Sequence, residues 1–280
     1  ADALRQTGAR SNALAGRIMC SLFYEPSTRT RLSFESAMLR SGGGVIGTEN
    51  AREFSSAAKG ESLEDTIRVI GHYADAIVLR HYESNAAIRA AGVSRVPIIS
   101  AGCGKGQHPT QALLDVYTIR QRRTDLTGLR VAMMGDLKHG RTVRSLAYLL
   151  GKYPKIELYF ASPEELRLEQ DIRAHFQEHG IYFREYESVE DIIDSVDVLY
   201  ITRLQQGRMP DEDYARLSGS YSLNRGMAQR MKEGSIIMHP LPRVGELSTD
   251  VDTLPGAVYL NEQVESGVLV RMALLSSLLR

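Results

Sequence analysis

The sequence has only two cysteines, no tryptophan and no net charge. Cys20 and Cys103 lack CxxC spacing, which argues against a disulfide scaffold or a cysteine-rich metal site and is typical of free thiols in a reducing compartment. The 34 basic and 34 acidic residues balance, so bulk charge favours neither nucleic acid nor an anionic membrane as partner. Apolar runs are too short to span a membrane, and the start lacks the apolar core of a secretory signal. We therefore expect a cytoplasmic protein with no nucleic-acid or membrane partner.

The pattern of apolar residues predicts strands that alternate with helices. A chain of 280 residues is long enough for two domains, and this alternation is typical of parallel α/β folds. A long helix from Thr110, expected to bury Leu113, Leu114, Tyr117 and Ile119, would join the domains, and a nearly apolar helix ends the chain. We predict two doubly wound parallel-sheet domains joined by interdomain helices. The strands are expected at 75–80, 96–100, 130–136, 156–160, 181–186, 197–201, 235–240 and 257–260.

The stretch "YEPSTRTRLSFESAMLRSGGG", residues 24–44, places two arginines in the first turn of a predicted helix. Ser27 suits the N-cap, and Phe34, Ala37 and Met38 form an apolar stripe. Arg29 and Arg31 would lie at the positive end of the helix dipole, where a cation lowers stability. This pattern indicates an anion site suited to phosphate, although an ordinary capped helix with solvated arginines is also compatible with it.

Further arginines follow the predicted strands. In open α/β sheets the ligand crevice lies beyond the carboxyl ends of the strands. Four of the five segments after those ends carry an arginine, and two carry His-Pro: Arg80, "AGCGKGQHPTQ", "GDLKHGRT", "TRLQ" and "HPLPR". The set favours an anion-binding site over scattered surface charge. The prolines of "HPLPR" predict a rigid loop, with Leu241-Pro242 a candidate cis peptide.

Two other motifs favour different functions only weakly. "GCGKGQ" and "GDLKHGRT" satisfy neither GxxxxGK[ST] nor GxGxxG, so a nucleotide site is a minor alternative. "HFQEH", residues 175–179, fits the HxxEH pattern of some zinc peptidases, but it ends a helix and has no third ligand in view. We therefore predict no metal site.

Six motifs occur along the chain in this order: "STRTR", "KGES", "HPTQ", "GDLKHGRT", "TRLQ" and "HPLPR". Through these motifs the sequence resembles the catalytic chain of the aspartate transcarbamoylase family. The resemblance runs from about Leu14 to the C-terminus. Pro240 favours this family over ornithine transcarbamoylases, which have cysteine after the histidine of the last motif. The resemblance implies transfer of the carbamoyl group of carbamoyl phosphate to the amine of L-aspartate, a step of pyrimidine biosynthesis, with no cofactor and no metal.

The resemblance also implies the domains and the site residues. Residues 1–109 plus 267–280 would bind carbamoyl phosphate, and residues 110–266 would bind aspartate. The phosphate would lie on Ser27, Thr28, Arg29 and Thr30 beside Arg80; Thr30, Arg80 and His108 would polarise the carbamoyl oxygen, and Gln111 would accept from the carbamoyl amide. For aspartate, Arg141 and Arg203 would hold the carboxylates, with Gln205 and the backbone of Pro240 and Leu241 near the amine. Ser55 and Lys59 would enter each site from the neighbouring subunit of a homotrimer.

The sequence departs from the family pattern at several positions. Gly207 replaces a usual glutamate and is expected to loosen a loop on the aspartate side, Gly245 replaces Asn or Asp, and "YLNEQVESG" does not match the usual segment. Two alternatives remain: a carbamoyltransferase for another amino-acid acceptor, suggested by Gly207, or an inactive carbamoyltransferase-fold assembly protein. Regulatory chains or a larger multifunctional assembly are also compatible with the sequence.

Overall fold

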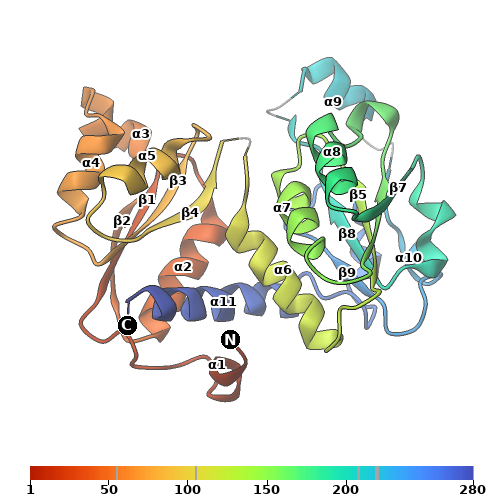
Figure 1. Cartoon of the computed structure of the whole chain (residues 1–280), viewed down its shortest axis with the longest axis horizontal. Helices are drawn as coiled ribbons and strands as arrows, with labels where there is room; N and C mark the ends of the chain where they lie inside the picture. The colour runs from red at the N-terminus through yellow and green to blue at the C-terminus, as the bar shows by residue number, and fades with distance from the viewer. Residues whose placement is uncertain (55, 105, 207–208, 218–220, 280) are drawn as a thin grey trace. The chain divides into compact units, whose positions relative to one another are not determined.

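The computed structural model describes residues 1–54, 56–104, 106–206, 209–217 and 221–279. The chain forms two compact units (Figure 1), one made of Ala1–Thr110 with Glu265–Arg280 and the other of Gln111–Val264. Both boundaries fall inside helices, α6 (Pro109–Arg122) and α11 (Glu262–Leu279).

The first unit is built on a parallel four-stranded sheet in the order β2-β1-β3-β4. The strands are β1 (Ile18–Phe23), β2 (Gly44–Thr48), β3 (Ala76–His81) and β4 (Ile98–Cys103). The helices and 3₁₀ turn are α1 (Asp2–Gln6), α2 (Thr28–Arg40), α3 (Ala51–Phe54), η1 (Ser56–Lys59), α4 (Leu63–Ile70) and α5 (Ala86–Val93).

Alternate residues of its central strands pack on opposite faces of this sheet, as the two-residue period of a strand requires. Val78 of β3 joins a core with Phe34 of α2 and Met272 of α11, whereas its neighbour Ile77 packs with Ile67 of α4. Figure 1 shows α2 and α11 along one face and α4 and α5 along the other. The predicted stripe of Phe34, Ala37 and Met38 is therefore confirmed as the buried face of α2.

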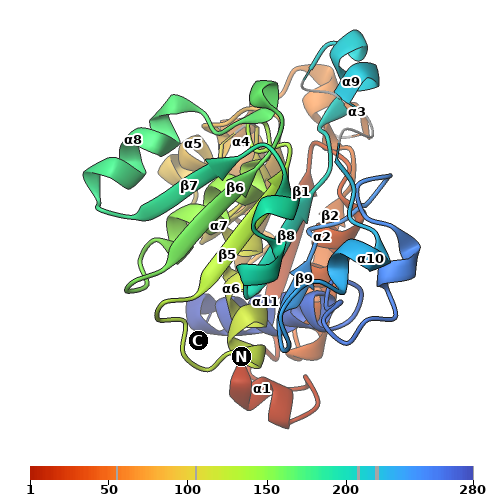
Figure 2. The same cartoon turned by 90° about the vertical axis from the view of Figure 1, so that its right-hand side faces the viewer.

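The second unit is built on a parallel five-stranded sheet in the order β7-β6-β5-β8-β9, which Figure 2 shows from one side. Its strands are β5 (Arg130–Gly135), β6 (Glu157–Ala161), β7 (Tyr182–Tyr186), β8 (Val198–Thr202) and β9 (Ile236–Met238). Its helices are α7 (Arg141–Leu150), α8 (Gln170–Glu178), α9 (Asp211–Leu217) and α10 (Arg225–Ala228), with 3₁₀ turns η2 (Glu164–Leu166), η3 (Val189–Asp191), η4 (Ile193–Ser195) and η6 (Thr249–Val251). Helices α7 and α8 cover one face, and α10 with η3 and η4 covers the other.

The predicted fold class is confirmed. Strands alternate with helices along the chain, the strands form two parallel sheets, and helices cover both faces of each sheet. Two local predictions were wrong. Leu113 is 41% exposed, since α6 buries a face that includes Val116 and Ile119 together with the polar Asp115 and Thr118. The expected strand at 257–260 is reduced to a single bridge between Ala257 and Ile237.

Candidate active site

The start of α2 places hydroxyl and guanidinium groups at one edge of the first unit. Ser27 occupies the N-cap, but its side chain makes no capping hydrogen bond, so the predicted capping hydroxyl is not used as a cap. Thr28 and Arg29 are exposed, whereas Thr30 is buried. The first turn of α2 thus presents polar side chains close to its own backbone N–H groups, as an anion site at a helix N-terminus requires.

Arg31 faces carboxylates of its own chain. Its guanidinium lies 3.4 Å from Glu35 and 3.0 Å from Glu49. Glu35 also accepts a hydrogen bond of 2.7 Å from the Ser21 hydroxyl. Arg31, the second arginine of the motif, therefore has a structural role.

Strand register brings Arg80 to the same edge. Arg80 of β3 pairs in register with Phe23 of β1, and the chain runs from β1 directly into α2. The Arg80 side chain is 13% exposed, and its guanidinium lies 3.8 Å from Glu25 and donates to the Ala101 carbonyl at 3.2 Å. The carboxyl ends of β1 and β3 therefore bring Arg80 close to the first turn of α2.

The remaining predicted residues of the first unit differ in accessibility. His108 is buried in the segment between β4 and α6. Lys59 is exposed at the end of η1. Ser55 lies outside the described residues.

In the second unit, Asp136 joins two of the predicted motifs. It follows β5, is fully buried, and accepts hydrogen bonds from the backbone N–H of His139 at 2.9 Å and of Gln205 at 3.1 Å. The His139 ring also lies 3.1 Å from this carboxylate. Asp136 thereby holds "GDLKHGRT", which leads to Arg141, against "TRLQ". This role of Asp136 was not predicted from the sequence.

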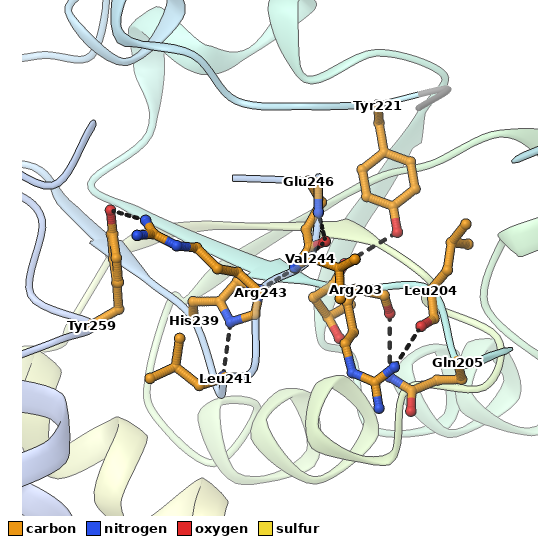
Figure 3. A network of polar contacts seen from close by, with 12 residues as sticks. Arg203, Leu204, Gln205, Tyr221, His239, Leu241, Arg243, Val244, Glu246 and Tyr259 are labelled. Carbon is orange, nitrogen blue, oxygen red and sulfur yellow. Dashed lines mark hydrogen bonds and ion pairs between the residues drawn. The ribbon is translucent and has the colours of Figure 1, made fainter. Parts of the chain in front are cut away.

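Arg203 follows β8 and is half-buried. Its guanidinium donates to the Leu204 carbonyl at 3.0 Å, and the Gln205 side chain donates to the Arg203 carbonyl at 3.2 Å (Figure 3). Within the part of the chain that the structure describes, no carboxylate lies within ion-pair distance of Arg203. Gly207, the expected departure in this loop, lies outside the described residues.

The loop after β9 is fixed by a buried histidine. The predicted cis peptide at Leu241-Pro242 is confirmed. The N–H of Leu241 donates to Nδ1 of His239 at 2.8 Å, so the ring proton resides on Nε2, which contacts Glu246 at 2.7 Å (Figure 3). Glu246 also accepts from the backbone N–H groups of Val244 and Gly245. The side chains of His239 and Glu246 therefore fix the backbone on both sides of Pro242.

Burial determines the charge states of His239 and Glu246. Burial lowers the pKa of His239, because the charged ring would lose its hydration, and this effect exceeds the attraction of Glu246. Burial alone would raise the pKa of Glu246, but the hydrogen bonds from His239 and the backbone lower it overall. His239 is therefore a neutral imidazole that donates a hydrogen bond to the carboxylate of Glu246.

Arg243, the arginine of "HPLPR", is not available to a ligand in the way that the strand-end pattern suggested. It forms a two-pronged ion pair with Asp252, one contact being 2.7 Å, and Tyr259 donates to the same carboxylate. Arg243 therefore braces the loop, and the prediction that counted it among the ligand-facing arginines was wrong.

The structure also bears on the zinc and membrane alternatives. The rings of His175 and His179 pack in a tilted arrangement with centroids 4.1 Å apart, and His175 also packs on Tyr148. Among the described residues, no group of three or more His, Cys, Asp or Glu side chains is placed to hold a metal ion. Within the same residues, no helix has both the length and the apolar composition needed to cross a membrane.

Two parallel α/β units with arginines beyond their strand ends form a class of fold suited to anionic ligands. Family models agree: residues 1–121 match the carbamoyl-P binding domain of aspartate/ornithine carbamoyltransferases, and residues 127–278 match their Asp/Orn binding domain. The chain therefore belongs to the aspartate/ornithine carbamoyltransferase family.

Individual relatives fall in the aspartate branch. The chain is 50% identical over 278 residues to a chloroplastic aspartate carbamoyltransferase 3 of Pisum sativum, covering 99% of this chain and 71% of that protein. It matches the catalytic subunit of M. jannaschii aspartate transcarbamoylase with a TM-score of 0.91 and 50% identity, over 99% of this chain and 90% of that one. A Trypanosoma cruzi aspartate transcarbamoylase in complex with N-(phosphonacetyl)-L-aspartic acid matches with a TM-score of 0.91 and 39% identity, over 100% and 88% of the two chains.

Proposed function

We propose that this chain is an aspartate carbamoyltransferase that converts carbamoyl phosphate and L-aspartate into N-carbamoyl-L-aspartate and phosphate in pyrimidine biosynthesis. The amine nitrogen of aspartate attacks the carbamoyl carbon, and the carbon–oxygen bond to phosphate breaks. The departing phosphate takes the proton of the amine. The aspartate carbamoyltransferases that resemble it over nearly its whole length support this activity.

The observation that carries the choice of acceptor is the surroundings of Arg203. A half-buried guanidinium is costly unless an anion balances it. In the described part of the chain no carboxylate lies within ion-pair distance of Arg203, whereas Arg243 in the same unit has Asp252. A carboxylate of the substrate would supply the missing charge, and an acceptor with an amine side chain, such as ornithine, would not.

We propose roles for the other residues from the resemblance of their motifs to the family. Ser27, Thr28, Arg29, Thr30 and Arg80 hold the phosphate of carbamoyl phosphate. Thr30, Arg80 and His108 donate to the carbamoyl oxygen, where negative charge develops; removing one such donor costs roughly 3 kcal/mol of transition-state stabilisation. Gln111 accepts from the carbamoyl amide, Arg141 and Arg203 bind the carboxylates of aspartate, and Gln205 with the backbone of Pro240 and Leu241 orients its amine.

The test is phosphate release from carbamoyl phosphate with a panel of amines. We expect aspartate to be the fastest acceptor, ahead of asparagine, ornithine and putrescine, and Arg203→Ala to remove most of this preference because the carboxylate loses its partner. N-(phosphonacetyl)-L-aspartic acid, which combines both substrates, should bind more tightly than either substrate in calorimetry. Failure of this compound to bind, together with faster carbamoylation of another amine, would favour the alternative acceptor.

We also propose that the enzyme works as a homotrimer in the cytoplasm, with Ser55 and Lys59 entering the neighbouring subunit's site. The exposed position of Lys59 at the end of a 3₁₀ turn is compatible with a role outside its own subunit. The plant relative is chloroplastic, so cell fractionation would distinguish the two compartments. Sedimentation of the purified chain would test the trimer.

A further inference from the structure

A buried carboxylate orients two glutamine side chains in the second unit. Asp115 of α6 is fully buried, and its Oδ1 accepts from Nε2 of Gln111 at 2.9 Å and from Nε2 of Gln263 at 2.7 Å. Because an ionised carboxylate can only accept, both amide groups must turn their NH₂ toward Asp115. The carbonyl oxygen of Gln111 therefore points away from Asp115 and can accept a hydrogen bond from elsewhere.

Gln263 extends this chain of hydrogen bonds to the loop after β9. Its carbonyl oxygen accepts from the backbone N–H of His239 at 3.0 Å, and Gln263 is only 3% exposed. The His239 ring then accepts from the N–H of Leu241 at 2.8 Å. Gln263 thus holds the backbone of His239, and the ring of the same residue holds the N–H of Leu241.

We propose that Gln263 and His239 are positioning residues for carbamoyl transfer. Asp115, Gln263 and His239 connect the Gln111 amide to the Leu241 backbone and thereby fix the distance between the group that holds the carbamoyl amide and the carbonyl that orients the amine. This inference rests on the proposed function, which assigns those roles to Gln111 and Leu241. Neither Gln263 nor His239 needs to touch a substrate.

The rate of carbamoyl transfer depends on how accurately the two reactants are positioned relative to each other. Bringing two reactants into the correct geometry can supply much of a rate enhancement, and a displacement of about 1 Å can cost about a hundredfold in rate. Buried, fully paired amides and imidazoles hold their orientation, because turning one would leave polar groups unsatisfied. If these hydrogen bonds served stability alone, breaking one of them would lower the unfolding free energy but leave the Michaelis constant for aspartate unchanged.

The first test replaces Gln263 with methionine, which keeps the length of the side chain but removes both hydrogen bonds. We expect kcat to fall and the Michaelis constant for aspartate to rise, with a combined loss of about a hundredfold in kcat/KM. The affinity for carbamoyl phosphate alone, measured by calorimetry, should change less than about twofold, because its phosphate would be held in the first unit. Gln229→Met, the same change at an exposed position at the end of α10, is the matched control and should leave all three constants unaltered.

The second test separates the two nitrogens of His239. Asparagine can place an acceptor near the position of Nδ1 and thus retain the bond from Leu241, whereas glutamine can place a donor near Nε2 and retain only the contact with Glu246. We expect His239→Asn to keep a Michaelis constant for aspartate closer to the parent value than His239→Gln does. A merely structural histidine would give the same constants for two variants of equal stability.

The outcomes distinguish this inference from the proposed function. If the parent protein does not carbamoylate aspartate, the proposed function fails, and with it the basis for the roles of Gln111 and Leu241. If the parent is active and Gln263→Met keeps both constants while folding normally, the positioning role is wrong. Should Gln263→Met fail to fold, the comparison of His239→Asn with His239→Gln decides the matter.

Discussion

Arg29 and Arg31 lie two residues apart in the first turn of α2, but their surroundings predict opposite phenotypes. Arg29 is exposed, whereas Arg31 lies within ion-pair distance of Glu35 and Glu49. We expect Arg29→Ala to remove most of the affinity for carbamoyl phosphate and leave stability nearly unchanged, because a cation at this helix end gains nothing from the dipole. Arg31→Ala should instead lower the unfolding free energy by about 1 kcal/mol, as partly buried pairs do.

Calorimetry with carbamoyl phosphate and urea unfolding of both variants provide the measurements. Each variant is the control for the other. Equal affinities for the phosphate donor in the parent and in Arg29→Ala would contradict the assignment of Arg29.

His239 predicts a specific dependence of stability on pH. Because burial lowers its pKa below the ordinary value of 6.5, the unfolded chain takes up a proton as the pH falls through 6.5 while the folded chain does not. This residue therefore lowers the unfolding free energy progressively as the pH falls below 6.5, and has no such effect above it. We expect the stability difference between the parent and His239→Asn to shrink between pH 7 and pH 5 in denaturant titrations. A constant difference would mean that His239 does not titrate in this way.

At the level of single residues, the sequence predicted the chemical character of the motifs better than it predicted which residues would form hydrogen bonds and ion pairs with one another. The polar character of "STRTR" and the rigid "HPLPR" loop followed from local patterns. The pairing of Arg31 with Glu49 and of Arg243 with Asp252 did not, because the folded backbone brings these residues together and no helical spacing relates them. The connection from Asp115 to Gln263 spans 148 positions, so no local spacing could have revealed it.

Gly135, at the end of β5, and Gly245, in the loop after β9, allow a matched test of how tightly neighbouring elements pack. Gly135 ends β5 with φ +116°, and a Cβ added there would lie 2.0 Å from the Thr202 carbonyl of β8. Gly135→Ala should therefore destabilise the protein by about 3 kcal/mol or more, since the backbone itself would have to move. Gly245, where a Cβ would meet nothing within 4 Å, should tolerate alanine within about 0.5 kcal/mol. Thermal unfolding of the two variants is the measurement, and equal losses would refute the steric argument.

The elements themselves were largely predictable, because hydrophobic periodicity reflects which face of a helix or strand is buried. The stripe of α2 and the alternation of β3 are examples. At α6 the prediction was wrong for Leu113, whereas Leu114 and Ile119 are buried as expected, and the buried face also includes the polar Asp115 and Thr118. Polar residues on a buried face interrupt the apolar pattern, and here one of them, Asp115, takes part in the hydrogen-bond chain to Gln263.

At the level of the whole molecule, the proposed trimer makes a prediction that one subunit alone cannot satisfy. If Lys59 enters the neighbouring site while Arg80 acts in its own subunit, trimers of Lys59→Ala chains and of Arg80→Ala chains are each inactive. A mixed trimer contains one site in which Arg80 comes from a Lys59→Ala chain and Lys59 from an Arg80→Ala neighbour. Random mixing in equal amounts should therefore restore about a quarter of the parent's sites. The measurement is carbamoyl-aspartate formation after the two variants are dissociated and reassembled together, with each variant reassembled alone as the control. Mixtures no more active than those controls, in samples shown by sedimentation to be trimeric, would place Lys59 outside its neighbour's site.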